Sequence, residues 1–125
     1  MGYKITWEDR VVVKRYWGRL TADEFFKSSE SIRGERRFDD IRYIINDLTD
    51  VESHDFDEEA IIQAVAMHLG TTAFNPNYRI AFVTGNHELA NLAGRINDVL
   101  LDEKHEIQNF SAMAEARNWI LNEAH

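Results

Sequence analysis

The segment YIINDLTDVESHDFDEEAIIQAV, residues 43–65, decides the fold of this chain. It begins as an apolar strand over residues 43–48, continues as an acidic turn and enters an apolar helix at about residue 57. The strand shows little alternation of apolar and polar residues, which is typical of a strand covered on both faces. The carboxylates of residues 55–59 suit the first turn of a helix, because its N-terminal dipole stabilises negative charge. The segment therefore predicts a buried strand followed by a helix.

The chain begins with a predicted β-hairpin. Residues 3–7 and 10–17 alternate between apolar and polar with a period of two, and we expect Gly18 to end the second strand. The alternation places Lys14 on the same face as Tyr16. Because a hairpin joins two antiparallel strands, it predicts an antiparallel edge for the sheet.

Helices and strands alternate after the hairpin. Thr21 and Glu24 form a capping box, which predicts a helix that reaches about Arg33 before Gly34. The order β-β-α-β-α-β-α-β-α predicts an α/β fold with a mixed, mostly parallel sheet and covering helices. No linker or repeat interrupts residues 1–125, so we expect a single domain. The later elements follow from their apolar patterns: a helix at 57–72, a strand at 79–84, a helix with a stripe of Leu89, Leu92, Ala93, Ile96, Val99 and Leu100, a strand at 107–110 and a helix that Ser111 caps.

The composition is that of an ordinary globular chain. With 125 residues, of which 44% are hydrophobic, it is large enough to bury roughly two-thirds of its unfolded surface. The absence of cysteine excludes disulfides, thiolate metal sites and cysteine nucleophiles, and it fits a reducing cytoplasm. No segment approaches the ~20 apolar residues that span a bilayer. We therefore expect a cytoplasmic protein without a membrane span.

Negative charge is concentrated after the first strands and helix. The formal net charge is −8, and residues 43–125 carry four Lys and Arg against fourteen Asp and Glu. Such an acidic surface repels phosphate backbones. Nucleic-acid binding is therefore not expected.

The run Asp47-Leu48-Thr49, followed by Val51 and Asp55, resembles the STAS domain, the fold of the sporulation anti-anti-sigma factors. A regulatory STAS domain carries a phosphorylatable serine just after the second aspartate, where this chain has Phe56. The resemblance therefore implies a STAS fold without that phosphorylation switch. The nearby hydroxyls, on Thr49 and Ser53, lie several residues before the position that the family uses.

A closer resemblance rests on the order and spacing of five segments: ITWE at 5–8, GRLT at 18–21, YIIND at 43–47, NPNYRIA at 75–81 and ARNW at 116–119. Together they are similar to the SpoIIAA-like group of small bacterial proteins, which is classed with STAS and SEC14-type domains. The resemblance covers essentially the whole chain and implies a non-enzymatic binding module, because STAS domains bind partner proteins and some bind nucleotides or small molecules. SEC14-type domains enclose lipids with the help of a gating helix, an element that this sequence does not supply.

The carboxyl ends of the parallel strands form the natural ligand edge of such a sheet, beside the N-termini of the helices that follow. Their hydroxyls and amides, next to backbone N–H groups, suit a small polar or anionic ligand. The alternative is that these residues only cap their helices, as Thr, Asn and Ser commonly do. The residues expected at this ligand or partner edge are Asp47, Thr49, Thr84, Asn86 and Ser111.

No catalytic residues, cofactor or metal site are expected. Residues 47–59 contain seven carboxylates, but their spacing is not that of an EF-hand and no glycine makes the tight turn, so a solvated acidic loop is the interpretation. The five histidines form no HxxxH pair and are interpreted as residues at scattered surface or helix positions. Neither a G-x-G-x-x-G nor a Walker sequence is present, so we expect no enzyme.

The helix at 57–72 is apolar around much of its circumference. Packing in the core or in a dimer interface is the favoured interpretation. The alternative is that it lines a pocket for an apolar ligand, with Met67, His68 and Phe74 as the outer rim.

A homodimer is expected, since four covering helices cannot bury every apolar surface of the sheet. The aromatic residues of the hairpin are the predicted contact, because aromatic residues anchor many interfaces. They are Tyr3, Trp7, Tyr16 and Trp17.

Two functions of different classes follow. The preferred hypothesis is a cytoplasmic STAS-like binding or regulatory module that acts through protein–protein contact and lacks the phosphorylatable serine. The alternative is a small-molecule or lipid-binding carrier that uses an apolar pocket under the helix at 57–72.

Overall fold

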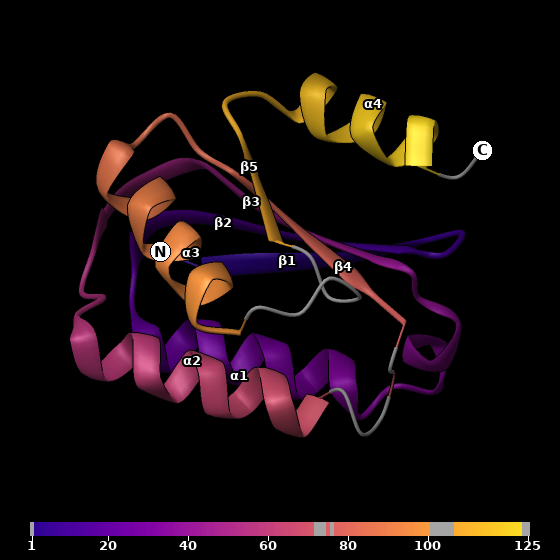
Figure 1. The fold of residues 1–125 in the computed structure, drawn as a ribbon, viewed down its shortest axis with the longest axis horizontal. Helices are drawn as coiled ribbons and strands as arrows, with labels where there is room; N and C mark the ends of the chain where they lie inside the picture. The colour runs from indigo at the N-terminus through magenta and orange to yellow at the C-terminus, as the bar shows by residue number, and fades with distance from the viewer. Residues whose placement is uncertain (1, 72–74, 76, 101–106, 124–125) are drawn as a thin grey trace.

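The computed structural model describes residues 2–71, 75, 77–100 and 107–123. Helices lie on both faces of one sheet, with α1 and α2 below it and α4 above it in Figure 1. In the part of the chain that is described, no helix combines the length and apolar character needed to cross a membrane. The elements are β1 (Gly2–Glu8), β2 (Val11–Leu20), α1 (Ala22–Arg33), the 3₁₀ helix η1 (Arg36–Asp40), β3 (Tyr43–His54), α2 (Glu58–Thr71), β4 (Arg79–Val83), α3 (His87–Leu100), β5 (Ile107–Phe110) and α4 (Met113–Glu123).

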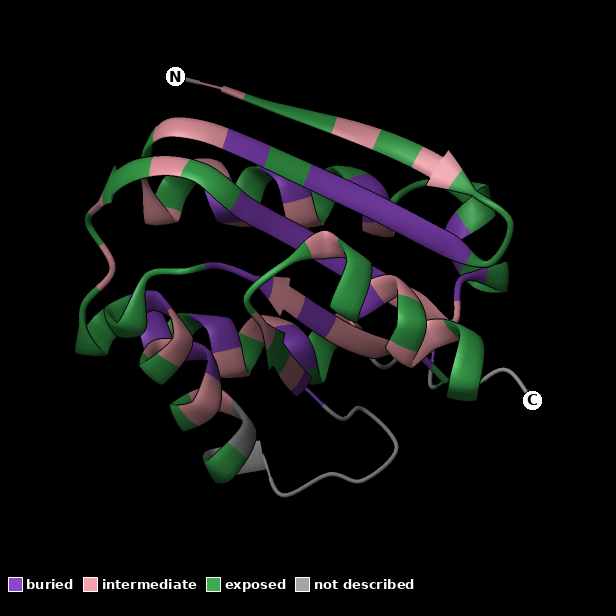
Figure 2. Ribbon diagram, turned by 90° about the horizontal axis from the view of Figure 1, so that it is seen from above, coloured by how far each residue is buried: buried purple, intermediate pink, exposed green. Residues whose placement is uncertain are grey.

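The five strands lie in the order β1-β2-β3-β4-β5, which is also their order along the chain. β1 pairs with β2 in antiparallel orientation, and the other three pairs are parallel. The predicted mixed sheet with an antiparallel edge is therefore confirmed. Figure 2 shows the effect on burial: the edge strand β1 alternates between exposed and intermediate residues, whereas the first half of β2 is almost continuously buried.

One face of the sheet is covered by α1, α2 and α3. Val12 and Ile44 point to this face, where they pack with residues of α1 and of the segment that follows it. Further along the strands, Leu48 packs with Phe25 of α1 and Leu89 of α3. Because side chains alternate along a strand, the neighbours of these residues face the other way.

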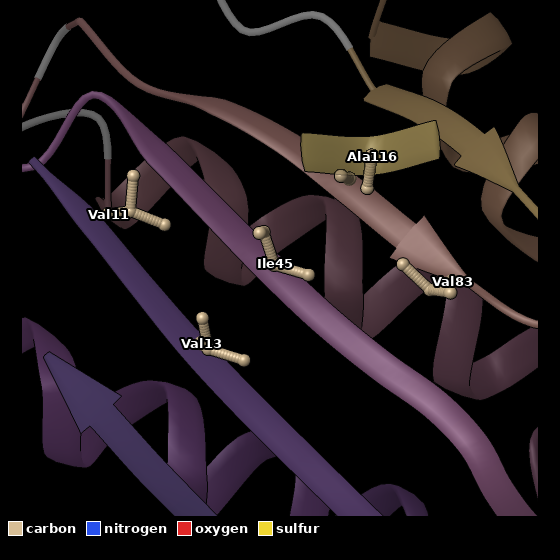
Figure 3. Packing of buried hydrophobic residues seen from close by; sticks show 6 residues of the cluster. Val11, Val13, Ile45, Val83 and Ala116 are labelled. Carbon is tan, nitrogen blue, oxygen red and sulfur yellow. The ribbon is translucent and has the colours of Figure 1, made fainter. Parts of the chain in front are cut away.

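Of the helices that the structure describes, α4 covers the opposite face. Ala116 of α4 is fully buried against Val11, Val13, Ile45 and Val83, as Figure 3 shows. These residues form one apolar cluster. Each strand residue in it is adjacent in sequence to a residue that faces the other three helices, so the predicted alternation of β2 is confirmed.

Both ends of α1 agree with the prediction. Thr21 accepts a hydrogen bond from the backbone N–H of Glu24 at 3.1 Å, which is the expected cap. Gly34 follows the last residue, Arg33, and its N–H donates to Glu30 O at 3.2 Å. The helix therefore begins and ends where its sequence signals lie.

Two strands are longer than predicted. The expectation that Gly18 ends the second strand is wrong: Gly18 lies within β2, at a φ of 74° and beside a register shift in the β2–β3 pairing. Glycine adopts this left-handed conformation without a Cβ clash, so the strand bends and continues to Leu20. Its partner β3 continues with it to His54, so the predicted acidic turn after residue 48 is mostly strand.

α2 is buried on one side only. Asp57 caps it, because its Oδ1 accepts from Ala60 N at 3.0 Å. Ala64 on the inner side is buried, whereas Ile62 and Leu69 are 68% and 60% exposed. The helix is thus not sandwiched in the core, and its apolar outer side remains on the surface.

The hairpin aromatics are arranged differently from the prediction. Tyr16 is fully buried, and Tyr3 packs on it with ring centroids 5.8 Å apart. Trp7 packs against the core on the same three-helix face. Trp17 instead lies under the guanidinium of Arg15, 5.7 Å from its ring centroid. Three of the four aromatics thus serve one face of the same molecule, and the homodimer stays a prediction without this support.

Candidate functional site

The structure brings predicted edge residues of three neighbouring strands to the same level of the sheet, although Asp47 and Thr49 lie within β3 and not at its end. Asp47 of β3 pairs with Val83 of β4, which pairs in turn with Phe110 of β5. Thr84, the next residue, donates its backbone N–H to Phe110 O at 2.9 Å. Asp47, Thr84 and Ser111 therefore follow one another across three neighbouring strands, with Asp47 inside β3 and the other two just after β4 and β5.

The side chains at this edge are engaged within their own turns. Asp47 Oδ1 accepts from both the backbone N–H of Thr49, at 3.1 Å, and its hydroxyl, at 2.7 Å. Thr84 Oγ1 accepts from Asn86 N at 3.0 Å, and Asn86 Oδ1 accepts from Leu89 N at 3.1 Å, which caps α3. These contacts are those of turn and cap residues.

Ser111 departs from its predicted role. Its hydroxyl donates to the carboxylate of Glu115 at 2.5 Å, so this bond does not cap a backbone N–H of α4. The backbone N–H groups of Glu115 and Ala116 donate to Ala112 O instead. The side chains that would bind a ligand at this edge are thus hydrogen-bonded within the chain. Ligand binding there stays a prediction.

The acidic stretch at residues 47–59 does not converge on a point. Asp50 pairs with Arg15 of β2, and Asp55 Oδ1 accepts from the backbone N–H of Ala22 at 2.7 Å. Among the residues that the structure describes, no group of three or more acidic or histidine side chains could hold a metal ion.

A cavity of about 60 Å³ lies beneath α2, between this helix, α1 and the sheet. Met67 and His68 line it, as the pocket hypothesis predicted, whereas Phe74 lies outside the described residues. An adjacent cavity of about 40 Å³ is lined by apolar residues of α1, α2, α3, β3 and β4. The two cavities share four lining residues: Phe25, Ala64, Phe82 and Ile96.

Of the five histidines, interpreted as residues at scattered surface or helix positions, His68 does lie in a helix, α2, but it is buried. This side chain is buried on the inner side of α2, and its Nδ1 lies 3.0 Å from the hydroxyl of Tyr78. The two rings meet edge-to-face with centroids 5.5 Å apart. His105 and His125 lie outside the described residues.

Two polar residues that the sequence pattern did not single out line the larger cavity. Lys14 of β2 and Asn46 of β3 are register partners on the three-helix face, and each is only 2% exposed. Lys14 Nζ donates to Ser29 Oγ of α1 at 2.7 Å. Burial lowers the pKa of Lys14 to about 7, because desolvation disfavours the charged amine.

A signal for this pair was present in the sequence. The alternation of residues 10–17 put Lys14 on the face of Tyr16, and Asn46 interrupts the apolar run of β3. A polar side chain on an inward face is costly to bury, so its presence there points to a cavity or a partner.

No family model matches this chain, and no curated protein sequence matches it. Two solved structures are similar to it in fold. One is an uncharacterised protein of the DUF3478 family with a SpoIIAA-like fold from Shewanella loihica PV-4, with a TM-score of 0.59, 13% identity, and 94% of this chain and 91% of that chain covered. The other is the anti-sigma factor antagonist SpoIIAA in its unphosphorylated form, with a TM-score of 0.59, 10% identity, and 95% of this chain and 97% of that chain covered.

The chain therefore has a SpoIIAA-like, STAS-type fold, as its sequence predicted. At these identities the similarity defines the fold alone.

Proposed function

We propose that residues 1–125 form a single-domain, non-enzymatic cytoplasmic module that acts through contact with proteins. The fold supports this proposal, because one of the structures with a similar fold is an anti-sigma factor antagonist. Phosphorylation is not part of the proposal. Phe56 stands where the regulatory STAS domains carry serine, and its ring packs edge-to-face on Phe25 with centroids 5.7 Å apart.

One surface feature carries the proposal. Ile62 and Leu69 are separated by two turns of α2, and their 68% and 60% exposure is unusual for large aliphatic residues. Val65 and Ala66 lie between them on the same side of the helix. We call these four residues the α2 outer stripe. A continuous exposed apolar stripe is typical of a protein-interaction surface.

The proposed occupant of the α2 outer stripe is a second copy of this chain. In a two-fold dimer the same surface contributes from both subunits, so one stripe can cover the other. This assigns the predicted homodimer to α2, because the aromatics of the hairpin are mostly engaged within one molecule.

Sedimentation equilibrium tests this contact. The wild-type chain at micromolar concentration should have twice the 14.6 kDa mass of one chain, and the double variant Ile62→Glu/Leu69→Glu should be monomeric. Gln63→Glu, which adds a charge at an exposed position of the same helix, is the matched control and should remain dimeric. A wild-type mass near 14.6 kDa throughout a dilution series would show that the stripe does not bind a second copy.

Mass spectrometry tests the absence of a phosphorylation switch. After incubation with a serine kinase that acts on STAS domains, residues 49–57 should carry no phosphate, since Phe56 has no hydroxyl. Phosphate on Thr49 or Ser53 together with altered mass in sedimentation would contradict the proposal.

A small-molecule carrier is the second candidate function. The observation that favours it is the pair of adjacent cavities beneath α2, the larger of which contains the buried Lys14 and Asn46. The cavities lie on the inner side of α2, whereas the α2 outer stripe faces away from the sheet. The two candidate functions therefore use different sides of one helix and can be tested separately.

A further inference from the structure

The inward-facing pair Lys14 and Asn46 lies between two apolar residues in one row of the sheet. Ile5 of β1 precedes Lys14 in this row, and Phe82 of β4 follows Asn46. Both polar side chains are 2% exposed beneath α1 and α2. Burial of such groups is costly unless they form hydrogen bonds.

The hydrogen bonding of this pair is incomplete. Ser29 Oγ donates to Phe25 O at 3.0 Å, so the hydroxyl accepts the bond from Lys14 Nζ. The amine also lies 4.6 Å from the ring centroid of Phe25. Asn46 Oδ1 is buried and has no hydrogen-bond partner among the described residues. The pair therefore presents a donor that can serve a further acceptor and an acceptor without a donor.

Charge at the pair is also uncompensated. The pKa of Lys14 falls to about 7 through desolvation alone, with no acidic side chain of the described residues contributing. A buried amine of this kind is stabilised by a ligand that brings a negative charge or a proton of its own. A carboxyl group does this, because one acid and one amine together add no net charge, whichever of the two holds the proton.

The cavities supply a polar end and an apolar end. Lys14 and Asn46 line the larger cavity, of about 60 Å³, and the neighbouring cavity of about 40 Å³ is lined by apolar side chains, among them Leu48, Phe56 and Leu89. Phe25, Ala64, Phe82 and Ile96 line both cavities, so the two are adjacent. At about 10–15 Å³ for each water-sized group, the two cavities hold roughly seven to ten such groups.

We propose that the paired cavities bind an aliphatic carboxylic acid of about six to eight carbons, with its carboxyl group at Lys14 and Asn46 and its alkyl chain toward Leu48. A carboxyl oxygen accepts from Lys14 Nζ, and the acid O–H, when present, donates to Asn46 Oδ1. This inference rests on the carrier function and gives it a ligand class and a head-group site.

Titration calorimetry with octanoate, and with octan-1-ol as the uncharged comparison, tests this assignment. Wild-type protein should bind octanoate with one-to-one stoichiometry and bind octan-1-ol at least tenfold more weakly. Lys14→Met should weaken octanoate binding at least tenfold. Lys27→Met is the matched control, because Lys27 is exposed on α1 and pairs only with Asp23 in the same helix, and it should leave binding unchanged.

Each other outcome overturns a defined part of the inference. Equal binding of octanoate and octan-1-ol, or equal octanoate binding by wild type and the Lys14→Met variant, would leave a carrier but remove the carboxylic-acid assignment. No binding of either probe to folded wild-type protein would remove both the ligand class and the carrier function. If Lys14→Met does not fold, as judged by circular dichroism, Asn46→Leu takes its place with the same expected loss.

Discussion

The two faces of the sheet differ in the side chains that are buried on them. Under α4, Val11, Val13, Ile45 and Val83 pack on Ala116, and the buried carboxylate of Asp47, which alternates to the same face, accepts hydrogen bonds from Thr49. Under α1, α2 and α3, the interior also holds Lys14, Asn46 and His68 and leaves the two cavities. The face with one helix is thus packed for stability, whereas the face with three helices retains polar groups that an ordinary core excludes. Such groups in an interior are typical of a binding site, which is maintained at a cost in stability.

Trp119→Ala should have the largest effect, because it opens the apolar face. The indole packs on Tyr43 and Phe110 with ring centroids 5.7 and 5.5 Å apart. Its partial burial places the loss of unfolding free energy at the lower end of the range for Trp→Ala, about 3 kcal/mol. Urea unfolding followed by circular dichroism measures it, with the exposed neighbour Asn118→Ala as control. Equal midpoints for the two variants would mean that α4 does not hold this face closed.

Lys14→Met should raise the free energy of unfolding instead of lowering it, because it removes a polar group from the interior of the other face. At pH 7 the variant should be more stable than wild type by about 2 kcal/mol, as when buried charged groups are replaced by apolar ones. An equal or lower stability of the variant at pH 7 would mean that the buried amine is not a cost to the fold.

The pH dependence of the Lys14→Met difference provides a second measurement. The pKa of Lys14 is about 7 in the folded protein and about 10.4 in the unfolded chain. Between these values the unfolded state binds more protons, so wild-type stability rises with pH through this window and levels off below it. The stability difference between the variant and wild type should therefore shrink as pH rises from about 7 to about 10. Urea titrations at several pH values would reveal a constant difference if the amine is not desolvated.

The helix caps give a smaller contrast between the faces. Thr21 accepts from Glu24 N at the start of α1, whereas Ser111 donates to a carboxylate at the start of α4. Thr21→Ala should therefore cost about 1 kcal/mol, and Ser111→Ala less than about 0.5 kcal/mol, as for a surface substitution. Thermal unfolding of both variants measures the contrast, and a larger loss for Ser111→Ala would mean that this hydroxyl caps α4 after all.

Arg117→Ala should have the smallest effect, about 0.5 kcal/mol, because the ion pair with Glu8 is more than one-third exposed on both sides. The hydrogen bond from Arg117 lowers the pKa of Glu8, against a smaller opposing effect of desolvation. A carboxyl group whose pKa is lowered on folding stabilises the folded state at pH values above its pKa in the unfolded chain. The stability difference between Arg117→Ala and wild type should therefore be present at pH 7 and lost as pH falls through the acid range. Adding 1 M salt should also reduce it. A difference that survives both treatments would have another origin.

Most of the fold could be predicted because its signals are local. The N-cap at Thr21 and the period-two alternation of β2 each depend on residues close in sequence, and both are confirmed. The extension of β2 beyond Gly18 could not be predicted in this way. A glycine is equally compatible with the end of a strand and with a bend inside one, and the long pairing with β3 decides between them.

The candidate sites divide in the same manner. Thr84 lies just after β4, as the parallel order requires, but Asp47 lies inside the longer β3. The hydrogen bonds that both side chains form with nearby residues were predicted only as an alternative. The Lys14 site depends on how three helices meet over the sheet and on the space that they leave. Period-two alternation showed which way Lys14 faces, but alternation contains no information on the packing above it.

The agreement between strand order and chain order has a consequence for how the molecule folds. Each strand pairs with the one made just before it, so the sheet can grow from the hairpin outward, and each parallel pairing closes a single crossover connection. The contact between Arg117 and Glu8 joins residues 109 positions apart and depends on all five strands being in place. We expect it to form after the rate-limiting step, so that loss of Arg117 accelerates unfolding and leaves the refolding rate unchanged in stopped-flow measurements. In this chain α4 therefore packs onto a sheet that has already formed.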